Sequence, residues 1–284
     1  MALGLIEVFG FTTSIVVADA VAKAADVTIV ALDKNKPANG DAAEVPLLMT
    51  IKFEGDVAAV EAGMQAGVAL AESRGLLVTS HMISRQEAAA LVQDGMTLGM
   101  LGFVTLSVPE ELLVSLEERF LAEGHPRDLN VFYTSAIGDG GEHGANHLAH
   151  AGLVRRMVGA HVGLAPKLNP LITGNQIETF CAPQGVLVHM CRAMAGHKCG
   201  VITHVGLKTF CDPEVEACCF NDAARKAHTE GRGIVQSIEI DGRRLLHYKL
   251  TPPDVCFIKA TYGDSRGNLS MEKEGLFLEQ LEMA

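Results

Sequence analysis

The sequence predicts an α/β protein made of two different folding units that meet near Ile83–Ser84. Before this point, short apolar strands and two amphipathic helices follow each other within about 80 residues, which is a small α+β pattern. After it, a Gly- and His-rich sequence alternates strands and helices as in an open α/β sheet. The length of 284 residues is sufficient for two domains. We therefore expect domains at residues 1–83 and 84–284.

The first unit is expected to place two helices on a four-stranded, antiparallel-type sheet. Ala2–Phe9 alternates Leu, Ile and Val with other residues and is typical of a strand. Gly10 ends it, and Thr12 or Thr13 can cap the next helix through its hydroxyl. In that helix, at about Ser14–Ala25, Asp19 and Lys23 have the i,i+4 spacing of a supporting ion pair. The elements expected next are a strand at Val27–Leu32, a polar loop at Asp33–Glu44, a strand at Val45–Phe53, a helix from Gly55 to Ser73 and a strand at Leu76–Ile83.

The second unit is expected to begin with a helix, because Ser84-Arg85-Gln86-Glu87 has the pattern of a capping box. A helix that starts at Pro109 carries acidic residues in its first turn, where the helix dipole favours them. The elements expected here are helices at Gln86–Val92 and from Pro109 to Ala122, and strands at Met96–Phe103, Leu129–Thr134 and Val255–Ala260.

Charge and hydropathy restrict the partners of the chain. The net charge of −11 argues against nucleic acid or an anionic membrane surface as the main partner. The longest apolar stretches, such as Ile15–Ala18 and Val45–Ile51, are far shorter than the roughly 20 residues of a membrane span. No basic region precedes the apolar N-terminal residues, so we expect no signal peptide and a cytoplasmic protein.

The cysteine and histidine pattern gives weak support to metal binding, and we predict no metal site. An odd number of cysteines in an intracellular chain favours reduced thiols. Structural zinc sites usually supply close ligand pairs, and the sequence has no CxxC motif. His143, His147 and His150 would share one face if they lay on a helix, and packing or hydrogen bonding is favoured over metal for them. The seven cysteines all follow the junction: Cys181, Cys191, Cys199, Cys211, Cys218, Cys219 and Cys256.

Residues 1–83 resemble the bacterial microcompartment shell-protein domain. The matching segments are ALGLIEVFG at 2–10, AADAVAKAADV near 17–27, KFEGDVAAVEAGMQAGVALAES at 52–73 and VTSHMI at 78–83. The resemblance implies hexameric tiles that meet edge to edge, with Lys23 and Arg85 at the tile edge. Without it, Lys23 would be read as a solvated helix lysine. The resemblance also implies a pore loop within Asp33–Glu44, here longer and bulkier than usual: Lys36, Pro37, Ala38, Asn39 and Gly40.

Residues 84 to about 274 resemble the family I coenzyme A transferases, in particular the propionate/acetate CoA-transferase type. The resemblance implies a loop whose backbone N–H groups hold the oxygen of an acyl thioester. Ser107 stands at the second glycine of this loop's GF-x3-G-x-P pattern, and Lys208 replaces another usual glycine. The matching segments are 94–120, 124–133, 146–168, 205–213 and 263–274, and the residues assigned to the loop are Gly102, Phe103, Val104, Ser107 and Pro109.

The resemblance supplies no catalytic residue here, because the family's glutamate nucleophile belongs to its second half. We expect this chain to contain only the first half. Glu110, Glu111, Glu272 and Glu274 are interpreted as helix-start or surface carboxylates.

The leading interpretation is a structural shell protein that assembles with itself and with other shell proteins, in the shell of a cytoplasmic microcompartment. Its CoA-transferase-like domain would be inactive alone. In the alternative, the chain is half of an enzyme for acyl-CoA:carboxylate exchange and needs a chain that bears the nucleophile. A third interpretation is a truncated or recombined gene product. No cofactor is expected, and a coenzyme A thioester is a possible substrate.

Overall fold

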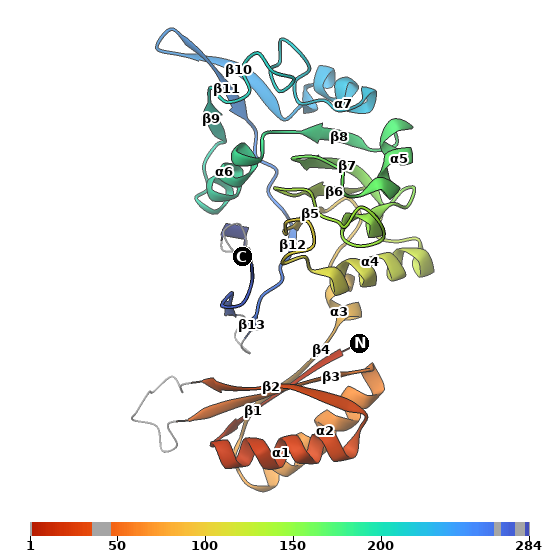
Figure 1. The fold of residues 1–284 in the computed structure, drawn as a ribbon, viewed down its shortest axis with the longest axis vertical. Coiled ribbons are helices and arrows are strands. Elements are labelled where there is room, and N and C mark those ends of the chain that lie inside the picture. Colours follow the sequence, from red (N-terminus) through yellow and green to blue (C-terminus); the bar gives the residue numbers. More distant parts are fainter. Residues whose placement is uncertain (1, 36–46, 264–267, 276–281, 284) are drawn as a thin grey trace. The chain divides into compact units, whose positions relative to one another are not determined.

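The computed structural model describes residues 2–35, 47–263, 268–275 and 282–283 of the chain (Figure 1). The chain divides into two compact units. The first contains Met1–Ala88 and Gly263–Asn268, and the second contains Ala89–Tyr262 and Leu269–Ala284.

The first unit is a four-stranded antiparallel sheet with two helices, as the sequence predicts. The strand order is β2-β3-β1-β4. The two central strands, β1 and β3, are therefore neighbours in the sheet although α1 and β2 lie between them in the sequence. Gly67 lets helix α2 approach the sheet closely, since a Cβ atom there would lie 2.4 Å from Cδ1 of Ile6 and 2.7 Å from Cγ2 of Val21. The elements are β1 (Ala2–Phe9), α1 (Phe11–Ala24), β2 (Val27–Asn35), β3 (Leu48–Gly55), α2 (Val57–Ser73) and β4 (Leu77–Ser84).

The first helix begins differently from the prediction. Its N-cap is Gly10, with φ 85°, and no side chain caps it, so the expected cap by Thr12 or Thr13 is wrong. Ser14 instead donates a hydrogen bond from its hydroxyl to the Phe11 carbonyl at 2.7 Å. Glycine suits this position because a positive φ costs it no steric strain.

The strands on either side of the predicted pore loop have other limits than expected. Strand β2 continues to Asn35, because Asp33 pairs with Thr50 across the sheet and forms an ion pair with Lys52 at 2.8 Å. Strand β3 begins at Leu48 rather than Val45. The pore-loop residues Lys36, Pro37, Ala38, Asn39 and Gly40 lie outside the described residues.

The second unit is built on a five-stranded parallel sheet with the order β12-β5-β6-β7-β8. A three-stranded antiparallel sheet, β10-β11-β9, is inserted in the chain between β8 and β12 of the parallel sheet. The strands are β5 (Thr97–Met100), β6 (Leu129–Phe132), β7 (Val154–Gly159), β8 (Glu178–Cys181), β9 (Val201–Thr203), β10 (Val235–Ile240), β11 (Arg243–Tyr248) and β12 (Val255–Phe257), with the short β13 (Tyr262–Gly263) and β14 (Leu269–Ser270). The helices are α3 (Arg85–Ala90), α4 (Glu110–Glu123), η2 (Ala145–Leu148), η3 (Pro166–Leu168), α5 (Asn169–Thr173), α6 (Gln184–Ala195), α7 (Asp222–Ala227) and η4 (His228–Arg232).

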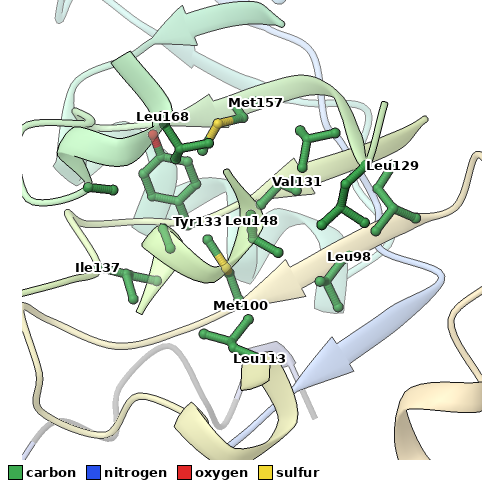
Figure 2. Packing of buried hydrophobic residues seen from close by; sticks show 14 of the residues in the cluster. Leu98, Met100, Leu113, Leu129, Val131, Tyr133, Ile137, Leu148, Met157 and Leu168 are labelled. Atoms are coloured by element: carbon green, nitrogen blue, oxygen red, sulfur yellow. The ribbon is translucent and has the colours of Figure 1, made fainter. Parts of the chain in front are cut away.

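The parallel sheet is buried on both faces, as expected for this class of fold. One core cluster joins Leu98 and Met100 of β5 and Val131 of β6 with Tyr133, which directly follows β6, and with Leu113 of α4 (Figure 2). A second cluster packs α6 against Phe132, Val158 and Phe180. The carboxyl ends of parallel strands lie at one edge of the sheet, where ligand sites of such folds usually form. The loop predicted as functional follows β5 at this edge. In the described part of the chain, no helix is both long and apolar enough to cross a membrane.

Candidate functional site

The loop 102–109 connects β5 to α4 and is fixed by main-chain hydrogen bonds. Phe103 and Leu106 exchange N–H···O bonds of 3.0 and 2.8 Å, which closes a tight turn. Val104 donates to the Ala136 carbonyl at 2.9 Å and accepts from the Gly138 N–H at 2.8 Å. The loop is therefore attached to the segment that follows β6.

Three residues of this loop have backbone angles that favour glycine. Gly102 has φ 153°, and a Cβ atom there would lie 2.7 Å from Cγ2 of Val108. Val104 and Ser107 have φ 58° and 54°, in the left-handed region, although both carry side chains. Such a conformation costs a residue other than glycine about 1–2 kcal/mol. The loop thus keeps at Ser107 a backbone conformation that glycine adopts without strain.

The side chain of Ser107 contacts a carboxylate that is distant in the sequence. Its hydroxyl donates to Oε2 of Glu274 at 3.0 Å, and Nζ of Lys259 lies 3.9 Å from the same oxygen. The Glu274 side chain is only 9% exposed. The expectation that Glu274 is a surface carboxylate is therefore wrong, because it is buried beside the loop. Ser107 and Glu274 are 167 positions apart in the sequence, and no local pattern indicates this contact.

The loop offers main-chain hydrogen-bond donors. Among the described residues, no acceptor pairs with the N–H of Ser107 or of Val108. Pro109, which follows them, has no N–H and precedes the first residue of α4. Adjacent donors held by a fixed backbone are suited to stabilise a carbonyl oxygen on which negative charge develops. Phe103 and Leu106 are about half exposed and form an apolar part of the same loop.

A cluster of two histidines and two glutamates lies behind the loop, between α4 and η2. His147 contacts Oε1 of Glu110 through Nε2 at 2.8 Å and Oε2 of Glu117 through Nδ1 at 2.5 Å. His150 contacts the other oxygen of Glu117 at 2.6 Å, and the Gly144 N–H donates to Glu110. Burial alone would raise the pKa of Glu117, but hydrogen bonds from His150 and His147 outweigh it and hold that pKa below its usual value.

The three histidines of the predicted helix face are not on one helix. η2 is a single turn from Ala145 to Leu148, so His143 and His150 lie outside it. His143 is exposed and pairs with Asp139 at 2.6 Å. In the part of the chain that the structure describes, no three His, Cys, Asp or Glu side chains are arranged to hold a metal ion. The polar contacts of the cluster join protein groups, so its evident role is to attach η2 to α4.

The segment 204–219 is organised around one buried carboxylate. Asp212 accepts from the Lys208 N–H at 2.7 Å and the Glu214 N–H at 3.0 Å, and both Nη atoms of Arg244 contact it. These contacts, led by the Arg244 hydrogen bond, lower the pKa of Asp212 to about 2. Lys208 has φ 62°, so it too occupies a left-handed backbone position, at a residue where the resemblance found in the sequence implies glycine.

The cysteines near this segment are buried and reduced. The Cys211 thiol donates to the Cys181 carbonyl at 3.8 Å, and the Cys218 thiol donates to the Cys211 carbonyl at 3.7 Å. Burial raises the pKa of Cys219 to about 11, which disfavours its reactive thiolate. Cys199 is exposed.

The two predicted tile-edge residues, Lys23 and Arg85, both belong to the first unit. Lys23 lies in the last turn of α1, is well exposed and pairs with Asp19 at 2.7 Å, which confirms the expected i,i+4 pair. Arg85 is the first residue of α3, and its side chain lies outside what the structure describes.

Two family models match the chain in succession. The BMC domain matches residues 2–86, and Coenzyme A transferase matches residues 82–284. The chain belongs to the coenzyme A transferase family. Its CoA-transferase domain follows a BMC domain, so both resemblances found in the sequence are confirmed, as is the fold class of each part.

Individual relatives agree with this division. Caffeate CoA-transferase of Acetobacterium woodii is 39% identical over 72% of this chain and 38% of its own length. A crystal structure of the acyl-CoA transferase YdiF from Escherichia coli O157:H7 has a TM-score of 0.66 at 31% identity, covering 71% of this chain and 38% of that one. The shell protein PduK of Citrobacter freundii is 45% identical over 29% of this chain and 48% of its own length. The chain thus spans less than two fifths of the length of these two transferases.

Proposed function

We propose that this chain is a structural shell protein of a bacterial microcompartment, located in a shell within the cytoplasm. Its BMC domain assembles into hexameric tiles, and each tile carries the CoA-transferase domains of its chains. The observation that carries the proposal is a complete βαββαβ unit at residues 2–84 that matches the BMC domain model. Its similarity to a protein named as a microcompartment shell protein supports the same assignment. Self-assembly and contacts with other shell proteins follow from it.

Lys23 is proposed to act at the edge between tiles, together with Arg85. The Lys23 side chain is 74% exposed and its pairing with Asp19 is local, so a surface i,i+4 ion pair of small energy is all that holds it. A second tile could therefore engage this side chain without disturbing the core of the domain. The pore is proposed to be formed by Lys36, Pro37, Ala38, Asn39 and Gly40.

The oligomeric mass of the full chain tests the shell function. We expect particles of about six times the 30.2 kDa chain mass by light scattering, and hexagonal sheets by negative-stain microscopy. The substitution Lys23→Ala is expected to abolish sheets and leave hexamers intact. Lys34→Ala, on an exposed residue of β2, is the matched control and should keep both. A stable monomer or dimer of the unaltered chain would refute shell assembly.

A second candidate function is half of a CoA-transferase that exchanges coenzyme A between an acyl-CoA and a carboxylate. The N–H groups of Ser107 and Val108, which have no acceptor among the described residues, support it, since adjacent main-chain donors suit a thioester oxygen. Relatives named as alpha subunits support a divided enzyme, since acetate CoA-transferase subunit alpha of Escherichia coli matches over 76% of its length at 24% identity. The glutamate nucleophile would come from the second half of the enzyme.

An exchange assay separates the two candidates. The chain alone is expected to transfer no coenzyme A from acetyl-CoA to labelled propionate, because the described domain supplies no nucleophile of the family. Addition of the remaining part of the Acetobacterium woodii caffeate CoA-transferase, beyond the segment matched here, tests whether this half is competent. Exchange in the mixture would establish the second candidate. Exchange by the chain alone would contradict the assignment of an inactive domain.

A further inference from the structure

A cleft separate from the loop 102–109 lies in the second unit, between α6 and β9. Its volume is about 310 Å³, which is the lower end of the range for small-molecule sites. The cleft is lined by all of β9, from Val201 to Thr203, and by residues from the C-terminal half of α6. Figure 1 shows where α6 and β9 lie in the second unit. β9 ends its sheet and has a strand neighbour only in β11. Main-chain groups on its other edge are therefore available to a ligand.

Two cationic side chains, Arg192 and Lys198, line this cleft together with the imidazole of His189, in a chain whose net charge is −11. His189 and Arg192 are three residues apart on α6 and therefore share a face of the helix. Lys198 follows the helix and lines the same cleft. Within the described residues, neither His189 nor Lys198 has a side-chain hydrogen bond or ion pair that would neutralise or occupy it. Such a concentration of donors without acceptors attracts an anion.

Arg192 is only partly used by the protein. Its Nε donates to Oε1 of Glu282 at 2.9 Å, and its side chain is 52% exposed. The contact is made through Nε alone, so the two Nη groups of the guanidinium have no partner in the described part of the chain. The second oxygen of Glu282 is buried and has no donor there either. This single-point pair leaves the fork of Arg192 free to bind a second anion.

We propose that this cleft binds a phosphate group of a small molecule. A guanidinium fork, an ammonium and an imidazole together provide the donors and the positive charge that a phosphate dianion requires, whereas one carboxylate would leave several of them unused. Glu282 competes with the ligand for Arg192, because both are anions on one guanidinium. This proposal concerns a different site from the loop 102–109 and does not depend on the proposed function.

Calorimetric titration of the full chain with pyrophosphate, at low ionic strength to limit screening, tests the site. Arg192→Gln and Lys198→Gln are each expected to weaken binding about tenfold, the loss expected for one charged hydrogen-bonded contact. Glu282→Gln is expected to strengthen it, since it removes the competing carboxylate. Lys226→Gln, on an exposed lysine of α7 that does not line the cleft, is the control and should change nothing.

The outcomes are distinct. Equal weakening by Lys226→Gln would show binding by net charge alone and would overturn the proposal, as would unchanged binding in Arg192→Gln and Lys198→Gln. The opposite sign expected for Glu282→Gln cannot arise from misfolding, and thermal unfolding of each variant checks its fold. Titration with glycerol 3-phosphate and with coenzyme A identifies the source of the phosphate. The compound whose binding is weakened by Arg192→Gln and Lys198→Gln represents the chemical class of ligand that the site binds.

Discussion

Replacing Asp212 with Asn perturbs the contact that organises the segment 204–219. The Asp212 side chain is 1% exposed, and its two oxygens serve two main-chain N–H groups and both Nη atoms of Arg244. Asparagine keeps the shape but retains only one acceptor oxygen and turns an NH2 group toward a donor. The variant therefore loses the ion pair and leaves at least one buried N–H group unpaired.

The expected loss follows from the pKa of Asp212 and from that unpaired donor. A pKa of about 2, against a usual value of about 3.9, corresponds to about 1.5 kcal/mol at neutral pH after allowance for the solvent that reaches Arg244. An unpaired buried N–H adds about 1 kcal/mol. We expect Asp212→Asn to lower the free energy of unfolding of the CoA-transferase domain by about 2–3 kcal/mol.

The sign of the pH dependence provides a second test. A carboxylate whose pKa is lower in the folded state stabilises the fold above its unfolded pKa, near 4, and loses that effect as the pH falls toward 2. The difference in stability between the parent and Asp212→Asn should therefore shrink as the pH is lowered from 5 to 2. Urea unfolding followed by circular dichroism measures this difference at each pH.

The matched control is Asp222→Asn. The Asp222 side chain is 80% exposed and forms an ion pair with Arg225 at 2.8 Å, so its loss should change stability little. If Asp212→Asn and Asp222→Asn shift the urea midpoint equally, the Asp212 contacts do not hold the segment. A parent–variant difference that stays constant down to pH 2 would equally refute the argument.

Three further substitutions test packing and backbone strain, each by thermal unfolding. Tyr133→Phe should stabilise the CoA-transferase domain by about 1 kcal/mol, because the Tyr133 hydroxyl is buried with no partner in the described residues; a loss would reveal a bridging water. Lys208→Gly should stabilise the same domain by about 0.5–1 kcal/mol by relieving the left-handed φ of 62°, whereas Lys208→Ala should give no gain. Gly67→Ala should destabilise the BMC domain by about 1–3 kcal/mol through overlap with Ile6, and a neutral result would show that α2 is free to move outward.

The elements of the BMC domain could be predicted from sequence because their signals are local. Each strand and helix there has eight residues or more and a regular apolar pattern, which short-range reasoning resolves. The errors were at the boundaries of elements. A threonine was predicted to cap α1, whose N-cap is Gly10, and the last residues of β2, Asp33–Asn35, were predicted to belong to a loop. A cross-strand ion pair between Asp33 and Lys52, which no local pattern encodes, accompanies the extension of β2.

The CoA-transferase domain was less predictable because its strands are short and its site contacts are distant in sequence. β5 and β6 lie within the strands predicted at Met96–Phe103 and Leu129–Thr134 but have only four residues each, and the equally short β8 was not predicted. The loop residues were located by resemblance, but the contact of Ser107 with Glu274 was not. The i,i+4,i+7 spacing of the histidines would place them on one face of a helix, but η2 is a single turn that begins after Gly144 and ends before Ala149.

The backbone at Ser107 and Lys208 bears on whether the domain is competent. Both residues replace a usual glycine, which argues from sequence against an intact site. Yet their φ angles of 54° and 62° lie in the left-handed region, so each position retains a backbone that glycine would adopt. At Ser107 the added hydroxyl is directed to Glu274, and the N–H of Ser107 is left without an acceptor in the described chain. The serine at position 107 therefore does not occupy the main-chain N–H groups that the loop offers as hydrogen-bond donors. A lack of activity in the chain alone would then agree with the second candidate function proposed above, in which a second half supplies the nucleophile.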